Sequence, residues 1–361
     1  MSEQGQPFEQ GGKSGPSTSP STPPARLARP RWFMAAWMMV ALALALSAGL
    51  LWLVSRWNEP YGSGRRLVEI PRGYSLERIA SRLEEEQVVS SALLFRLYVR
   101  LRASASDLKA GEYLFDRPLS LAQVAEKLRS GDIHYHRAVV REGLDLQEIA
   151  RDLAAQEWGR RDALLQLLQD PAWIADLDAR AQDLEGYVFP DTYFFPRSAT
   201  PRQVLKTMVD RTRRIWNEQR QARARSLGMS LREVLTLASL IEEEAARADE
   251  RRLISSVFHN RLRQNIKLDC DPTVVYAVKR QGLYDGIIHL SDLRIDSPYN
   301  TYLYPGLPPG PIANAGLASI DAALNPADTD FLFFVARNDG SHVFSRTYRQ
   351  HQRAVERFQR P

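Results

Sequence analysis

The chain has 361 residues, of which 44% are hydrophobic and 25% charged, with a net charge of +5 and a pI of about 9.3. This composition is ordinary for a globular protein of two or three domains, and no dense block of Lys and Arg marks a nucleic-acid surface, so the charge favours phospholipid heads or an anionic glycan as partners. The single cysteine, Cys270, excludes an internal disulfide and a cysteine-based zinc site, and we expect it to be structural.

The N-terminal region combines a polar segment with a long apolar one. Residues 1–31 are rich in Gly, Ser, Pro, Gln and Arg, and we expect them to form a disordered cytoplasmic tail. Residues 32–54 carry no charge, which predicts a transmembrane helix, because about 20 such residues cross a bilayer. This run is too long for a cleaved signal peptide. Arg26, Arg29 and Arg31 precede it, so we expect the N-terminus to be cytoplasmic and the rest of the chain to lie outside.

An internal repeat begins the exterior part of the chain. Residues 68–83 and 138–153 each contain a short strand, a glycine turn and an amphipathic helix, with Ser75 or Asp145 as the helix cap. A third helix of the same pattern follows the strand-like segment that begins at Gly111. Small modules of strands with helices on one face predict an α+β fold.

The first module, residues 66–135, resembles the LysM-like fold, which elsewhere binds polymers of N-acetylglucosamine. The pattern does not separate a glycan-binding module from a spacer.

The segment EGYVFPDTYFFP, residues 185–196, interrupts a mostly helical region. Its two prolines preclude a regular helix. We expect Phe194 and Phe195 to pack in the core, whereas Glu185, Asp191 and Tyr193 are candidates to face a cleft.

Three consecutive glutamates end an apolar helix that Ser230 caps, with Glu233 completing a capping box. At about 100° per residue, Glu243 points away from the apolar direction and should be solvated, while Glu242 and Glu244 lie on the two flanks. A carboxyl in a half-buried groove can keep its proton near neutral pH, as a general acid must. Helical geometry does not choose between the two flanking residues, and the alternative is that all three are simply solvated.

A rigid loop follows in the sequence, SPYNTYLYPGLPPGPIANAG at residues 297–316. Its five prolines stiffen the backbone, and we expect it to bury little apolar surface and to serve a site. A helix (SIDAALNP), a strand (FLFFVA) and a shorter strand-like segment (SHVFS) come after it.

From Leu237 to the C-terminus the chain strongly resembles the YceG-like family, the endolytic murein transglycosylases. The matching segments are LASLIEEEA, SSVFHNRL, DPTVVYA, SPYNTY, GLPPGPI and FLFFVA with SHVFS, in this order. The resemblance implies a catalytic region over residues 136–361 and peptidoglycan as substrate. It assigns the catalytic acid/base to Glu244, with Glu242 as the alternative. Cys270 before Asp271 departs from the more usual form of the family.

By this resemblance the enzyme cleaves between N-acetylmuramic acid and N-acetylglucosamine, leaves 1,6-anhydro ends and terminates strand elongation, with no metal or cofactor. Glu242, Tyr299, Asn300 and Tyr302 are our candidates for binding substrate and supporting the positive charge that develops at C1. The expected partners are glycan strands, the inner membrane and cell-wall synthases, and no nucleic acid.

Two other functions compete with this interpretation. A non-catalytic anchored scaffold could bind glycan strands and recruit cell-wall synthases. A metallohydrolase is disfavoured, because the histidines, His134 and His136 among them, show no HExxH spacing.

Overall fold

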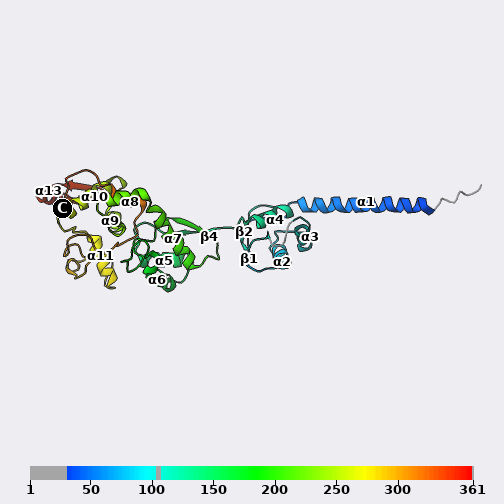
Figure 1. Cartoon of the computed structure of the whole chain (residues 1–361), viewed down its shortest axis with the longest axis horizontal. Helices are drawn as coiled ribbons and strands as arrows, with labels where there is room; N and C mark the ends of the chain where they lie inside the picture. The colour runs from blue at the N-terminus through cyan, green and yellow to red at the C-terminus, as the bar shows by residue number, and fades with distance from the viewer. Residues whose placement is uncertain (1–30, 103–106, 360–361) are drawn as a thin grey trace, which may run out of the picture.

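The computed structural model describes residues 31–102 and 107–359, so the predicted tail lies almost wholly outside the described residues. Figure 1 shows the long helix α1 (Arg31–Asn58) at one end, a small unit next to it and a larger unit at the other end. Residues 33–58 of α1 are long and apolar enough to cross a membrane, which agrees with the predicted span. Trp37 and Met38 are 64% and 72% exposed, as suits a helix that is long and apolar enough to cross a membrane.

The smaller unit has its own apolar core. Its elements are β1 (Arg66–Ile70), α2 (Leu76–Glu85), α3 (Ala92–Arg102), β2 (Gly111–Phe115) and α4 (Leu121–Ser130). The two strands pair antiparallel, with Val68 opposite Tyr113, and both of these side chains are fully buried. Trp57, near the end of α1, is buried in the same core.

The internal repeat takes the predicted form in both units. The Ser75 hydroxyl accepts a hydrogen bond from the Arg78 N–H, and the Asp145 carboxylate accepts one from the Glu148 N–H. The preceding turns contain glycines of nearly equal φ, +83° at position 73 and +80° at position 143. These left-handed positions favour glycine, which explains the residue that both copies share.

The larger unit is mainly helical with two small sheets. Strands β3 (His136–Val139) and β4 (Thr192–Phe195) pair antiparallel, as do β5 (Phe333–Ala336) and β6 (His342–Ser345). The α-helices are α5 (Leu146–Ala155), α6 (Arg161–Leu168), α7 (Pro201–Ile215), α8 (Glu218–Ser226), α9 (Leu231–Glu244), α10 (Arg251–Arg263), α11 (Asp271–Arg280), α12 (Leu317–Leu324) and α13 (Tyr348–Phe358). This mixed architecture of helices and small sheets confirms the α+β prediction at the level of fold class.

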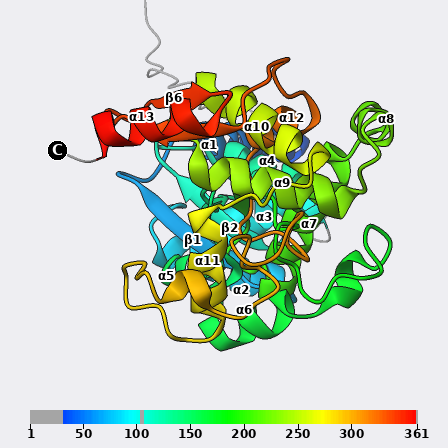
Figure 2. The ribbon, with the colours of Figure 1, turned by 90° about the vertical axis from the view of Figure 1, so that its left-hand side faces the viewer.

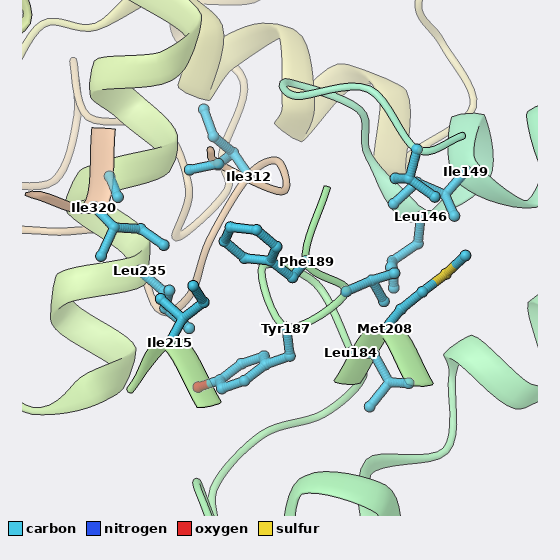
Figure 3. Close-up of a cluster of buried hydrophobic side chains, with 14 of the residues drawn as sticks. Leu146, Ile149, Leu184, Tyr187, Phe189, Met208, Ile215, Leu235, Ile312 and Ile320 are labelled. Atoms are coloured by element: carbon cyan, nitrogen blue, oxygen red, sulfur yellow. The ribbon is translucent and has the colours of Figure 1, made fainter. Parts of the chain in front are cut away.

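Helix α9 lies at the centre of the larger unit. It packs against α8, α10, α11 and α12, and Figure 2 shows this group at the end of the molecule that faces the viewer. The core joins segments that are far apart in sequence: Leu235 of α9, Phe189 of the turn before β4 and Ile312 of the proline-rich loop gather in one cluster (Figure 3). Helix α9 is therefore held in place by several segments.

Two expectations about burial were wrong. Phe195 is buried, but Phe194 is 62% exposed, because successive side chains of a strand point to opposite faces. The loop at residues 297–316 buries apolar surface after all, since Ile312, Ala313 and Ala315 are buried. Its rigidity serves packing as well as any site.

The two units are joined through a short connection before β3. The backbone N–H of His134 donates to the Glu112 carbonyl at 2.6 Å, and the His136 ring contacts the Glu112 carboxylate. Glu112 lies on β2 and His136 on β3, so this contact links the smaller unit to the larger one.

Candidate active site

The three glutamates occupy the last turn of α9. The Ser230 and Glu233 capping box predicted from the sequence is present at its start. The helix ends when Ala245 leaves helical geometry, with φ −90° and ψ 92°. Carboxylates at a helix C-terminus face the negative end of the helix dipole, which disfavours their charged form. The predicted faces also hold, because Glu243 is exposed while Glu242 and Glu244 are partly buried.

Glu242 is engaged by two groups of the protein. Its Oε1 lies 3.4 Å from a guanidinium nitrogen of Arg251, and its Oε2 accepts the N–H of Gly316 at 2.9 Å. The side chain is 8% exposed. This carboxylate ties α9 to the starts of α10 and α12, so a proton-transfer role would require it to leave both partners.

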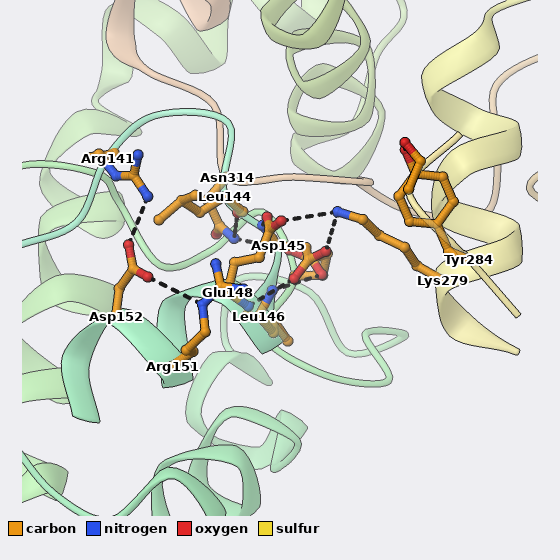
Figure 4. A network of polar contacts seen from close by, with 12 residues as sticks. Arg141, Leu144, Asp145, Leu146, Glu148, Arg151, Asp152, Lys279, Tyr284 and Asn314 are labelled. Carbon is orange, nitrogen blue, oxygen red and sulfur yellow. Dashed lines mark hydrogen bonds and ion pairs between the residues drawn. The ribbon is translucent and has the colours of Figure 1, made fainter. Parts of the chain in front are cut away.

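Glu243 lies over the turn of the second repeat. The residue is exposed, yet its Oε1 lies 3.0 Å from the position that a Cβ on Gly143 would occupy. Loss of hydration at the carboxyl raises the pKa of Glu243 to about 7, and the Lys279 ammonium opposes this rise. Glu243 therefore belongs to the surroundings of the network drawn in Figure 4, in which Lys279 bonds Asp145 and Glu148, each at 3.0 Å.

Glu244 faces the start of α11 and the strand β6. Its Oε1 lies 3.3 Å from Sγ of Cys270. Burial raises the pKa of the Glu244 carboxyl, the thiol contact lowers it, the negative charge of Asp271 raises it and His342 lowers it. A carboxyl with a raised pKa that is still partly open to solvent has the properties of a general acid at neutral pH.

A tyrosine and an aspartate line the same end of α11. The Tyr302 hydroxyl donates to Oδ1 of Asp271 at 2.5 Å, and the Asp271 charge acts on Glu244. Of the predicted substrate-binding residues in the loop, Tyr302 is thus linked to the surroundings of Glu244 by this contact.

Asn300 has no exposed surface. Its amide donates to the carbonyls of Leu293 and Ile295 and its Oδ1 accepts the Tyr302 N–H. Asn300 therefore shapes the loop that carries Tyr302.

Tyr299 lies at the other end of the α9–α11 pair. It lines a cavity of about 380 Å³ together with Arg232 near the start of α9 and Arg280 at the end of α11. Arg232 and Glu244 are separated by twelve positions, which is about 18 Å along a helix. The guanidinium of Arg280 stacks over the Tyr299 ring at 5.4 Å. The structure therefore does not bring Tyr299 together with Glu244.

The sequence predicts that Glu185 faces a cleft, but it does not reveal the side chain that hydrogen-bonds to it, Asn314. Glu185 is 5% exposed and lines the same cavity, where its carboxylate accepts from Asn314, from the Leu146 N–H and from the Tyr276 hydroxyl. Burial raises the pKa of Glu185 well above its usual range. Asn314 also bonds the Val188 N–H and the Leu144 carbonyl, so it joins the proline-rich loop to the second repeat (Figure 4).

A second omission is Glu142, in the turn of the second repeat. Burial and the charge of Glu242 raise the pKa of its carboxyl. A Cβ at Gly316 would meet this carboxylate at 1.8 Å, so the glycine permits the close approach. No periodic pattern in the sequence marks Glu142 or Asn314, because each acts across long sequence separations. Within residues 31–102 and 107–359 no group of three or more His, Cys, Asp or Glu side chains is arranged to hold a metal ion.

Comparison with known proteins gives consistent results. The sequence profile of the YceG-like family matches residues 68–357. An endolytic murein transglycosylase of Bacillus subtilis is 37% identical over 307 residues, which cover 81% of this chain and 84% of that protein. The enzyme of the same name from Streptococcus pneumoniae strain R6 is 29% identical over 323 residues, covering 80% of this chain and 57% of that protein.

A solved structure is similar as well. The crystal structure of a yceG-like protein from Listeria monocytogenes superposes with a TM-score of 0.56 at 33% sequence identity, over 81% of this chain and 99% of that one. Sequence profile, curated relatives and structure thus agree over the region that contains Glu244. The chain belongs to the YceG-like family.

Proposed function

We propose that the protein is a membrane-anchored endolytic lytic transglycosylase that cuts peptidoglycan glycan strands between N-acetylmuramic acid and N-acetylglucosamine. The observation that carries this proposal is the partly buried Glu244 carboxyl with its raised pKa, at the end of α9 in the region shared with curated endolytic murein transglycosylases. Residues 136–361 would form the catalytic region.

The reaction needs one proton-transfer group. Glu244 gives its proton to the glycosidic oxygen of the leaving N-acetylglucosamine while the bond from that oxygen to C1 of the muramic ring breaks. The C6 hydroxyl of the same ring then bonds to C1, and its proton returns to the Glu244 carboxylate. The products are a new N-acetylglucosamine end and a 1,6-anhydro-muramic end, and no water is consumed. A glycosidase that hydrolyses normally needs a second carboxylate.

The neighbouring residues would support this step in different ways. Tyr302, with its hydroxyl on Asp271, contacts the sugar next to the cut, and Asn300 holds the loop that presents it. Glu242 fixes the end of α9 through Arg251 and Gly316. Tyr299 would bind a sugar farther along the strand, since endolytic cutting places chain on both sides of the cleaved bond.

The smaller unit would serve as a LysM-like glycan-binding module over residues 66–135. Two antiparallel strands with two helices between them around a separate core support an independent module. With residues 32–54 in the inner membrane and the N-terminus cytoplasmic, module and catalytic region would lie outside, next to newly made strands. Cutting there would terminate elongation, with cell-wall synthases as partners.

The product distinguishes the proposed reaction from its alternatives. The full-length protein in detergent is incubated with isolated glycan strands in ¹⁸O-labelled water, and the fragments are identified by mass. We expect anhydro-muramic ends without label and long fragments early in the reaction. Label at C1 of most first products would identify a hydrolase, whereas intact strands that remain bound would identify the scaffold.

A further inference from the structure

Cys270, the only cysteine of the chain, is fixed by two threonines directly before α11. Its N–H donates to Oγ1 of Thr301 at 3.0 Å, and its carbonyl accepts the Thr273 hydroxyl at 2.6 Å. The two hydroxyl oxygens lie 2.9 Å apart. Because the Thr273 proton is used on the Cys270 carbonyl, Thr301 donates to Thr273, and the three residues close a ring of hydrogen bonds.

This ring aims the thiol at the candidate acid. Sγ lies 3.3 Å from Oε1 of Glu244, and Cys270 is 2% exposed. Burial, together with the nearby Glu244 charge, raises the pKa of the thiol well above its usual range, so sulfur keeps its proton. An ionised carboxylate can only accept, and therefore the S–H donates to Oε1.

We propose that Cys270 is a positioning residue for the transglycosylase reaction: its thiol holds Oε1 of Glu244 and leaves Oε2 as the oxygen that carries the catalytic proton. The role follows from the contact, because an oxygen that accepts the S–H is not available to hold the acid proton at the same position. The inference rests on the proposed function of Glu244.

The thiol would also influence how readily Glu244 gives up its proton. A donor to the carboxylate favours the charged form, whereas burial disfavours it. The other titratable groups that act on Glu244 are Asp271 at the start of α11 and His342 on β6, and His342 is paired with Glu250 at 2.7 Å. On its own helix, Glu242 and Glu243 precede it in the sequence. The thiol is the neutral donor among these groups, so its strength can be changed without a change of charge.

A nucleophilic role for Cys270 does not fit these surroundings. The thiolate is the reactive form, and a buried thiol beside a carboxylate is held in the protonated form.

The first experiment varies the donor and measures kcat/KM against pH for the full-length protein. Cys270→Ser supplies a stronger donor and Cys270→Ala removes it, while Val274→Ala also shortens a buried side chain of α11 but keeps the thiol. A general acid must be protonated, so activity falls as the pH rises through its pKa. We expect this basic limb to move to lower pH in the serine variant and to higher pH in the alanine variant, by about half a unit or more.

The alanine variant should also lose kcat by several-fold with KM little changed, because an unheld carboxyl is oriented correctly less often. The basic limb of Val274→Ala should coincide with that of the unmodified protein. If all three variants share the unmodified limb, or if both Cys270 variants move in the same direction, the proposal is overturned.

A second experiment does not depend on glycan cleavage. The chain has one thiol, so its S–H stretching band in the infrared spectrum belongs to Cys270. When Glu244 ionises, it becomes a stronger acceptor and the band should shift to lower frequency as the pH rises. In Glu244→Gln this pH dependence should vanish. If the frequency of the band changed with neither the pH nor the substitution, the contact between Cys270 and Glu244 would be disproved. If the band behaved as expected but the protein cut no strands, only the enzymatic function would be contradicted.

Discussion

Glutamine at each of three consecutive positions separates the roles of the carboxyls at the end of α9. Glu244→Gln keeps the volume and a hydrogen-bonding end but cannot transfer the proton, so we expect a loss of about a hundredfold or more in turnover. The measurement is the rate of anhydro-end formation from isolated glycan strands. Glu243→Gln is the matched control and should be nearly silent, because that side chain lies over the turn of the second repeat and Cys270 contacts Glu244 instead.

The Glu242 variant tests the alternative assignment of the catalytic acid. Glu242→Gln should lower thermal stability, since it leaves Arg251 without its carboxylate partner. If Glu244→Gln turned over normally while a folded Glu242→Gln were inactive, the acid would be Glu242.

For single residues, the sequence predicts which face of a helix a side chain occupies, but it does not predict which distant residues contact that side chain. The helical period correctly assigned Glu243 to the exposed face, because that depends only on the angle between successive residues. The partners of the other two glutamates come from distant segments: Gly316 from the start of α12 and Cys270 from the turn before α11. No local pattern in the sequence contains such contacts, and for this reason geometry left the choice between Glu242 and Glu244 open.

Among the elements, the turn before β4 and the proline-rich loop meet at one glycine. Gly186 has φ +82°, and a Cβ there would lie 2.4 Å from Cγ of Pro311. A proline ring cannot move aside easily, so we expect Gly186→Ala to lower the free energy of unfolding by about 2–4 kcal/mol. Chemical denaturation of the full-length protein measures this loss.

Gly228 provides the control for backbone strain. It has φ +70°, but nothing lies within 4 Å of an added Cβ. Gly228→Ala should therefore cost only the left-handed conformation, about 1–2 kcal/mol. Equal losses of unfolding free energy in the two variants would show that the clash between the added Cβ and Pro311 does not contribute to the effect of Gly186→Ala.

Elements were predictable where local signals coincide. Both repeats combine a left-handed glycine, a cap and an apolar period of 3.6, and each signal alone favours the same helix start. The loop at residues 297–316 lacks a period. Its burial follows from Asn314, whose side chain satisfies backbone groups of two other segments, and this is a tertiary effect.

For the whole molecule, the arginines before residue 32 predict that the two units lie outside the cytoplasm. Protease added to spheroplasts should digest the units beyond α1 while a cytoplasmic control protein survives. Units that stay intact until the cells are lysed would reverse the predicted orientation.

The burial of Trp57 has a consequence for how the enzyme meets its substrate. Trp57 of α1 belongs to the core of the smaller unit, Leu53 packs against that core, and the Trp57 ring meets the Tyr98 ring edge-on at 5.3 Å. The C-terminal end of α1 is thus packed into the smaller unit, and we expect the helix and this unit to move together. Helices tilt in bilayers by about 20° on average, and the tilt changes with hydrocarbon thickness. If α1 spans the membrane, such a change would tilt the smaller unit, and the contacts of Glu112 with His134 and His136 would move the larger unit with it. Lipid composition would then set which strands come within reach of Glu244, with the fold of the enzyme unchanged.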